Sequence, residues 1–193
     1  MLLETLLAPL VAHALAEDLA GGDLTTEATV DPGTQVLGWA VPRGEIVVCG
    51  GDVFRAVFRG IDPSLEVTLN VADGARAVRG DVLWTVRGSA RSILMGERTA
   101  LNFVQRMTGI ATLSRRYADA VPPGCEVRIT DTRKTTPGLR VLERYAVRTG
   151  GAYNHRDTLG SAVLIKDNHI IASGGITAAL GRARRRAPHT SRL

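Results

Sequence analysis

Residues 126–148, EVRITDTRKTTPGLRVLERYAVR, place a short β-rich run before a cluster of charges and a helix-forming segment. The run at 126–130 predicts a strand, the Pro-Gly pair at 137–138 predicts a break, and residues 138–148 predict a helix. The same order returns later, with a strand predicted at 162–165 and a helix near 177–187. Strands that alternate with helices over short connections are typical of a parallel sheet or a β/α barrel.

The first half of the chain has a different pattern. Residues 2–19 predict an amphipathic helix, because apolar side chains recur at spacings of three and four. These side chains are Leu3, Leu6, Leu7, Leu10, Ala14 and Leu15. Residues 20–33 are rich in turn formers, and β-rich runs at 35–41, 45–50, 65–71 and 81–88 surround one expected helix at 51–62. This half predicts an α+β sandwich.

A helical pattern connects the two halves over residues 89–120, with a break expected at Thr108-Gly109. Its polar residues Arg98, Asn102 and Gln105 share a narrow edge of the helix. The sequence VPPG at 121–124 predicts a stop and a domain boundary. We therefore predict an α/β chain: an N-terminal α+β sandwich domain with linking helices at 1–120, and a partial, incomplete β/α barrel at 121–193.

The formal net charge of +5 indicates acidic partners, such as nucleic acid, phosphorylated metabolites or polycarboxylates. Only 4% of the residues are aromatic, which disfavours a surface that stacks single-stranded bases. The basic stretch at 181–192 contains no aromatic residue and is predicted to be a solvated helix face rather than a nucleic-acid patch.

The sequence carries weaker signals about the cellular compartment and about the roles of the two cysteines. No apolar run approaches the ~18–20 residues of a membrane span. Glu4 interrupts the apolar N-terminal run, so we predict a helix there rather than a signal peptide, and a soluble cytoplasmic protein. Cys49 and Cys125 lie far apart without metal-type spacing, and both are predicted to be buried or half-buried rather than in a disulfide or metal site.

Two lysines stand out in a chain that otherwise uses arginine, because only Lys134 and Lys166 are lysines among 24 basic residues. Each lies just after an apolar run that predicts a strand. A compact ammonium and a planar guanidinium bind anions differently, so two lysines placed alike favour sites that require a point charge.

Basic side chains cluster beyond the ends of the predicted strands. Parallel βα units bring the carboxyl ends of their strands to one edge, where ligands bind. Five cationic or titratable side chains would line one mouth there: Arg133, Lys134, His155, Arg156 and Lys166. One such cluster by itself is typical of a solvated face, but three on the same edge favour a receptor for a polyanion.

Four stretches, in this order and spacing, resemble one enzyme family. They are GERTALNFVQRMTGIAT (96–112), TDTRKTTPGLR (130–140), YAVRTGGAYNHR (145–156) and LIKDNHI (164–170). The chain resembles the quinolinate phosphoribosyltransferases, also called nicotinate-nucleotide pyrophosphorylases (carboxylating). The resemblance implies a sandwich domain followed by an incomplete barrel. It also implies a homodimer or higher homo-oligomer, in which the sandwich of one subunit covers the barrel mouth of another.

The resemblance further implies the reaction. Quinolinate and phosphoribosyl pyrophosphate, assisted by Mg²⁺, would give nicotinate mononucleotide, pyrophosphate and CO₂, a step of NAD biosynthesis. Roles follow from the matching positions. Arg133, His155 and Arg156 would hold the two quinolinate carboxylates beside Thr132, and Arg98 would reach the partner's site. Lys134 and Lys166 would be the catalytic and substrate-binding lysines, and no residue is predicted to be a metal ligand.

The family pattern continues beyond this chain, with further barrel strands that carry an acidic pair for ribose and metal and loops for the 5′-phosphate. We therefore expect a polypeptide of residues 1–193 alone to lack measurable activity and to associate through an open sheet edge. Two alternatives remain open: a relative or anion-binding fragment that acts on another pyridine carboxylate, and a basic module for nucleic acid.

Overall fold

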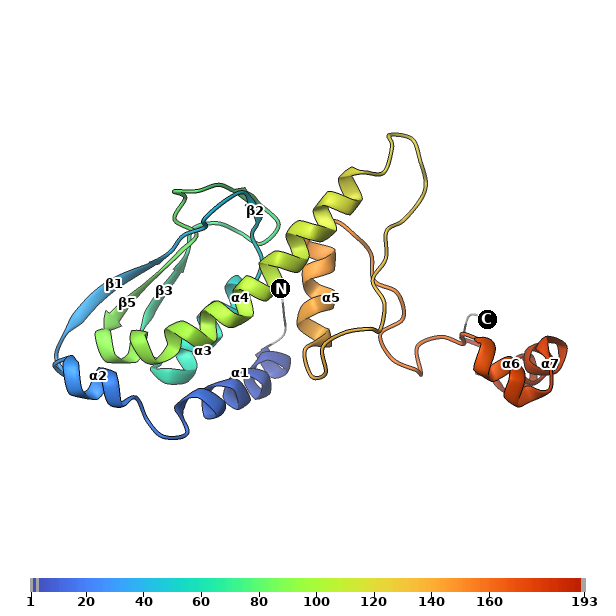
Figure 1. The fold of residues 1–193 in the computed structure, drawn as a ribbon, viewed down its shortest axis with the longest axis horizontal. Coiled ribbons are helices and arrows are strands. Elements are labelled where there is room, and N and C mark those ends of the chain that lie inside the picture. The colour runs from blue at the N-terminus through green and yellow to red at the C-terminus, as the bar shows by residue number, and fades with distance from the viewer. Residues whose placement is uncertain (1, 3, 192–193) are drawn as a thin grey trace. The chain divides into compact units, whose positions relative to one another are not determined.

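The computed structural model describes Leu2 and residues 4–191, which form two compact units (Figure 1). The N-terminal unit comprises Met1–Asp131 together with Thr135–Tyr153. The C-terminal unit comprises Thr132–Lys134 together with Asn154–Leu193. Each unit is described by itself below.

A three-stranded antiparallel sheet organises the N-terminal unit. Its order is β1 (Gln35–Ala40), β5 (Trp84–Ser89) and β3 (Glu66–Leu69). The register places Ala40 and Leu69 on either side of Trp84, which is 1% exposed. Because side chains alternate along a strand, this row faces the core while Trp39, in the next row, is exposed. The β-rich runs of the sequence analysis that correspond to these strands are confirmed.

A second, two-stranded ladder pairs β2 (Ile46–Val47) with β4 (Arg76–Ala77). Strand β2 lies within the predicted run at 45–50, whereas β4 was not predicted. Two residues are too few for a periodic signal, so only the pairing with Ile46 and Val47 identifies β4.

Helices α1 (Glu4–Leu19), α3 (Gly51–Ile61) and α4 (Ala90–Asp119) complete the core of this unit (Figure 1). Phe54 of α3 contacts Phe58 edge-on, with ring centroids 4.8 Å apart, and lies 5.0 Å from the Trp84 ring. Burying three aromatic rings in one cluster supplies much of the apolar area that stabilises a small domain. The predicted helix at 51–62 is confirmed.

The first helix begins at Glu4, and its buried face consists of Leu7, Val11 and Leu15. Leu6, predicted to belong to this face, is instead 46% exposed, and Leu3 lies outside the described residues. The turn-rich segment at 20–33 also contains an unpredicted short helix, α2 (Leu24–Thr29). Asp23 caps it by accepting a 2.9 Å hydrogen bond from the Thr26 amide.

Helix α4 is continuous over 30 residues, so the predicted break at Thr108-Gly109 is wrong. A glycine inside a helix costs about 1 kcal/mol, which tertiary contacts on both sides exceed. Met107 and Ala111 are buried against the core, and the Thr108 hydroxyl donates to the Cys49 carbonyl at 3.0 Å. The stop near residue 121 is confirmed, because α4 ends at Asp119.

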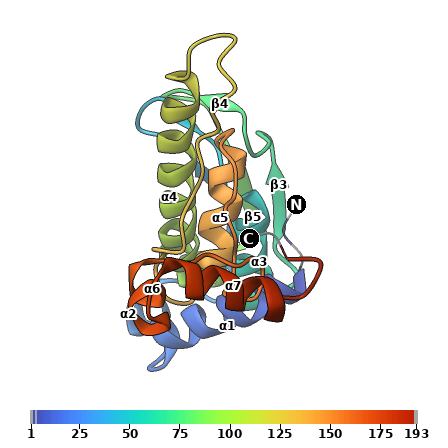
Figure 2. The same ribbon diagram turned by 90° about the vertical axis from the view of Figure 1, so that its right-hand side faces the viewer.

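Helix α5 (Arg140–Thr149) lies along α4 (Figure 2) and confirms the helix predicted at 138–148. The two helices meet closely at Gly150. A Cβ added there would lie 2.3 Å from the Ala111 carbonyl oxygen, so only glycine fits. Gly151 follows with a positive φ of 91° and turns the chain toward Tyr153.

The strands predicted at 126–130 and 162–165 are not formed in the part of the chain that the structure describes. Thr130 makes one isolated parallel bridge to Tyr153, whose amide donates to the Ile129 carbonyl at 2.9 Å. A β-rich run becomes a strand only where a neighbouring backbone completes its ladder, and that partner is not encoded in the run itself. These two predictions are therefore wrong, although the parallel direction of the bridge agrees with them.

The C-terminal unit contains two helices, α6 (Asp167–Ser173) and α7 (Ile176–Arg186), which contact each other (Figure 2). Helix α7 confirms the helix predicted near 177–187, whereas α6 was not predicted. The arginines of α7 are exposed, as expected for a solvated face: Arg182, Arg184, Arg185 and Arg186. Mixed α/β architecture, with a small sheet unit followed by a helical part, is thus confirmed.

The two cysteines differ in environment. Cys49 is fully buried, and burial together with the nearby Asp73 carboxylate raises its pKa to about 12. Cys125 is exposed, which corrects the prediction that both are buried. The sequence around Cys125 follows the VPPG stop, where no apolar periodicity directs a side chain inward.

We expect iodoacetamide at pH 8 to modify Cys125 and leave Cys49 intact, because the thiolate is the reactive form and Cys49 remains a protonated, buried thiol. Intact mass should show one adduct on the native protein, two in guanidinium, and none on native Cys125→Ser. Equal labelling of both cysteines in the native protein would contradict the burial of Cys49.

Candidate anion-binding site

Six of the seven predicted site residues belong to the C-terminal unit. They are Thr132, Arg133, Lys134, His155, Arg156 and Lys166. Residues more than 30 positions apart in the sequence therefore belong to one compact unit, and their convergence on a single mouth stays a prediction. Arg98, the seventh, belongs to the N-terminal unit.

The tripeptide Thr132–Lys134, which we call the anion loop, turns sharply. The Lys134 amide donates a 3.1 Å hydrogen bond to the Thr132 hydroxyl, a local contact typical of a serine- or threonine-closed turn. The side chains of Thr132 and Lys134, on either side of Arg133, are exposed, so the Lys134 ammonium is accessible to a ligand. Thr132 thus shapes the loop that carries the two cations.

Arg133 carries an unusual polar atom. Its Nε is buried and has no hydrogen-bond acceptor among the described residues. A buried donor left unpaired costs about 1–3 kcal/mol, and more when the group is charged. An anion that accepts from this N–H would remove the cost, so Arg133 has the properties expected of a ligand-binding guanidinium.

Arg156 and Lys166 are each held by one hydrogen bond within the C-terminal unit. Arg156 Nη1 donates to the Ala162 carbonyl at 2.9 Å, which limits the orientations of its guanidinium. The Lys166 amide donates to His169 Nδ1 at 3.0 Å where α6 begins, and the Lys166 side chain is exposed. His155 is also exposed. The guanidinium of Arg156 and the backbone of Lys166 are thus anchored within the same unit.

The charge of the chain is concentrated in the C-terminal unit. This unit has nine arginines and lysines but only two acidic residues, Asp157 and Asp167, whereas the whole chain has a net charge of +5. The N-terminal unit is therefore net acidic. Such an uneven distribution produces a positive electrostatic potential around the C-terminal unit.

The residues present do not fit a resident metal ion. No group of three or more His, Cys, Asp or Glu side chains among the described residues could hold one. Hard divalent cations bind several oxygen ligands, which a cluster of arginines and lysines does not supply.

Arg98 lies on an exposed edge of α4 together with Asn102 and Gln105, which confirms the predicted polar edge. Ser89 caps the N-terminus of α4: its hydroxyl accepts a hydrogen bond from the Ser92 amide at 3.3 Å. Arg98 is thus presented to solvent from a rigid element, and its role across a subunit interface stays a prediction.

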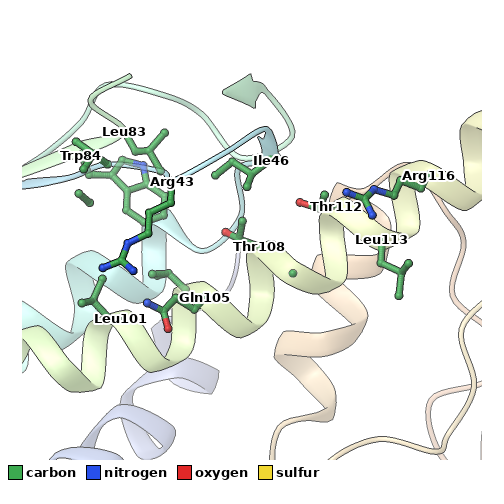
Figure 3. Close-up of a pocket in the computed structure, with 14 residues that line it drawn as sticks. Arg43, Ile46, Leu83, Trp84, Leu101, Gln105, Thr108, Thr112, Leu113 and Arg116 are labelled. Carbon is green, nitrogen blue, oxygen red and sulfur yellow. The ribbon is translucent and has the colours of Figure 1, made fainter. Parts of the chain in front are cut away.

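A cavity of about 490 Å³ lies elsewhere, within the N-terminal unit (Figure 3). Side chains of α4, among them Leu101 and Thr108, form one side, and Arg43, Ile46 and Trp84 contribute to the other. Its lining is mainly apolar and includes none of the predicted site residues.

Sequence reasoning missed the residues that fix the anion loop. Glu143 is a buried acid on α5 that accepts from Arg106 Nε at 2.9 Å, and Arg144 pairs with Asp131 at 3.3 Å. A usable signal was present: Glu143 lies four residues after Leu139 and three before Ala146, which is the spacing that places it on the apolar face of the helix.

Comparison with known proteins decides the family. A model of the quinolinate phosphoribosyl transferase N-terminal domain matches residues 23–108, and one of the C-terminal domain matches residues 110–193. The chain belongs to the quinolinate phosphoribosyl transferase family. The resemblance stated from the four sequence stretches is thereby confirmed.

Named relatives of this family align over most of the chain. The nicotinate-nucleotide pyrophosphorylase (carboxylating) of Mycobacterium leprae is 49% identical over 182 residues, which is 92% of this chain and 63% of the relative. The probable enzyme of the same name from Bacillus subtilis is 40% identical over 93% of this chain and 62% of its own length.

A solved relative shares the fold. The crystal structure of NadC from Streptococcus pyogenes aligns with a TM-score of 0.93 and 38% identity over 99% of this chain and 67% of that structure. The chain thus spans somewhat under two thirds of the length of the two curated relatives named above. No helix in the described part of the chain is both long and apolar enough to cross a membrane.

Proposed function

We propose that this chain supplies the quinolinate-binding part of a quinolinate phosphoribosyltransferase, which forms nicotinate mononucleotide, pyrophosphate and CO₂ from quinolinate and phosphoribosyl pyrophosphate. The observation that carries the proposal is the unpaired, buried Nε of Arg133 within a compact unit of excess positive charge. The names of the relatives agree with this chemistry.

The cations have two tasks in the proposed reaction. Quinolinate carries two adjacent carboxylates, and the guanidinium forks of Arg133 and Arg156, with His155, bind them in a fixed orientation. Pyrophosphate then leaves with growing negative charge as the pyridine nitrogen attacks the anomeric carbon. Lys134 and Lys166 are exposed point charges that stabilise this charge without the geometric demands of a fork.

Partners and cofactor follow as further parts of the proposal. Mg²⁺ enters with the diphosphate of the co-substrate, since the described residues offer no cluster to hold it. Arg98 acts on the site of another subunit in a cytoplasmic homodimer or higher homo-oligomer. Its exposed position on a rigid helix supports this role.

A second candidate is a site for a different pyridine carboxylate, and ligand selectivity separates it from the first. We expect quinolinate to bind to the purified protein about 10-fold or more tightly than nicotinate. The second carboxylate adds a charge-assisted hydrogen bond of about 1.5 kcal/mol, which is roughly tenfold in affinity. Isothermal titration calorimetry at constant ionic strength measures the affinities for quinolinate and for nicotinate.

Titrations with quinolinate, nicotinate and duplex DNA separate the remaining alternatives. Equal affinity for quinolinate and nicotinate would contradict the proposal and favour another pyridine carboxylate. Tight binding of duplex DNA that falls steeply with salt, without quinolinate binding, would instead support a nucleic-acid module.

A further inference from the structure

Both ends of the anion loop Thr132–Lys134 are anchored to the same helix. At the first end, Arg144 Nη1 of α5 lies 3.3 Å from Asp131 Oδ1. The two side chains are only 15% and 7% exposed, so this ion pair is largely shielded from solvent. The Asp131 amide also donates to the Tyr153 carbonyl at 3.0 Å, which fixes the backbone just before the loop.

At the second end, Thr135 and Thr136 are held from α5 and α4. Arg140 Nε donates to the Thr135 hydroxyl at 3.0 Å. The Thr136 amide points at both carboxylate oxygens of Glu143, 3.4 Å away, and the Thr136 hydroxyl accepts from Arg106. Arg106 is itself paired with Glu143. The chain is thus constrained directly after Lys134.

Helix α5 can serve both ends because of its residue spacing. Arg140, Glu143 and Arg144 lie at i, i+3 and i+4, so they project from one region of the helix surface. Buried Leu142 and Ala146 fix the helix in the core of the N-terminal unit. The anchors are therefore attached to a rigid element rather than to another loop.

We propose that α5 positions the anion loop, with Arg144 and Glu143 as positioning residues for Arg133 and Lys134. Three residues clamped at both ends have few conformations, so little entropy is lost when their cations bind an anion. Neither positioning residue touches the ligand. This inference deepens the proposed function and rests on it for the identity of the ligand, quinolinate.

The experiment compares Arg144→Ala with Arg148→Ala, a matched change one turn further along α5 at an exposed arginine. Amide hydrogen exchange of a peptide covering residues 131–136 should be faster in Arg144→Ala and unchanged in Arg148→Ala. Quinolinate affinity, measured by titration, should fall about 10-fold in Arg144→Ala only, the lower end of the cost of losing a supporting residue. Arg144→Lys retains the charge, so this variant should keep part of the exchange protection of residues 131–136 and part of the quinolinate affinity that Arg144→Ala loses.

Asp131→Asn removes the same ion pair without changing the side-chain shape, and provides the test if Arg144→Ala does not fold. Exchange and affinity equal to those of Arg148→Ala in both variants would overturn the inference. If the wild-type protein binds no quinolinate while exchange still responds to Arg144→Ala, the proposed function fails but the anchoring of the loop stands. Uniformly faster exchange over the whole chain would indicate global destabilisation and would also overturn the inference.

Discussion

Replacing Arg133 by alanine is expected to weaken quinolinate binding by ~1.5–3 kcal/mol, or about 10- to 150-fold, the usual size for a lost hydrogen bond between charged groups. The stability of the ligand-free protein should not fall, because the buried Arg133 Nε has no internal acceptor to lose and its removal relieves the cost of an unpaired donor. Titration calorimetry measures the first quantity and denaturant unfolding the second.

Arg182→Ala is the matched control for Arg133→Ala. It removes an arginine from the same unit, but from the exposed face of α7. Quinolinate affinity should be nearly unchanged in this variant at constant ionic strength. Equal losses in the two variants would mean that general charge, rather than the Arg133 guanidinium, attracts the ligand. Loss of stability without loss of affinity in Arg133→Ala would make Arg133 a structural residue.

Replacing Asp73 by alanine is expected to lower the free energy of unfolding by about 2–4 kcal/mol. The Asp73 carboxylate accepts from the Gly50 and Gly51 amides at 3.0 and 3.1 Å, where α3 begins with a glycine that has no capping side chain. It also accepts from the Tyr145 hydroxyl of α5 at 2.9 Å. Burial and the neighbouring Asp73 charge raise the pKa of Tyr145, so the hydroxyl remains a donor.

Two variants separate the contributions at Asp73, with guanidinium unfolding as the measurement. Tyr145→Phe removes the hydroxyl alone and should cost about 0.5–1.5 kcal/mol. Asp81→Ala removes an acid whose contact, to the Val78 amide, lies in an exposed turn, and should cost roughly 0.5 kcal/mol or less. If Asp73→Ala were no more destabilising than Asp81→Ala, the carboxylate would not cap α3.

The sequence analysis was accurate where a feature depends on neighbours along the chain. The strands at β1, β3 and β5 follow from β-rich runs between glycines, and α3 and α5 from apolar spacing. The structure places the predicted site residues other than Arg98 in one unit. The strands on which their grouping was argued are not formed among the described residues, so their convergence on one mouth stays a prediction. The family followed from four motifs in order.

Features that depend on distant residues could not be predicted in this way. The break expected in α4 is absent because Cys49, 59 residues away, binds the Thr108 hydroxyl and packing continues past Gly109. The runs at 126–130 and 162–165 have strand composition, yet a strand requires a hydrogen-bonding neighbour, and Tyr153 supplies only one bridge. Residue type sets the strand preference of a run, and a hydrogen-bonding neighbour decides whether the strand forms.

For this protein the sequence alone determined which residues are cationic, where the longer helices and the strands of the three-stranded sheet lie, and to which enzyme family the chain belongs. Only the tertiary structure decided that Arg133 has a buried N–H without an acceptor and that Glu143 and Arg144 hold the loop on which it lies. It also decided that Asp73 caps α3. Burial and hydrogen-bond partners arise from residues far apart in the chain, so no local pattern encodes them.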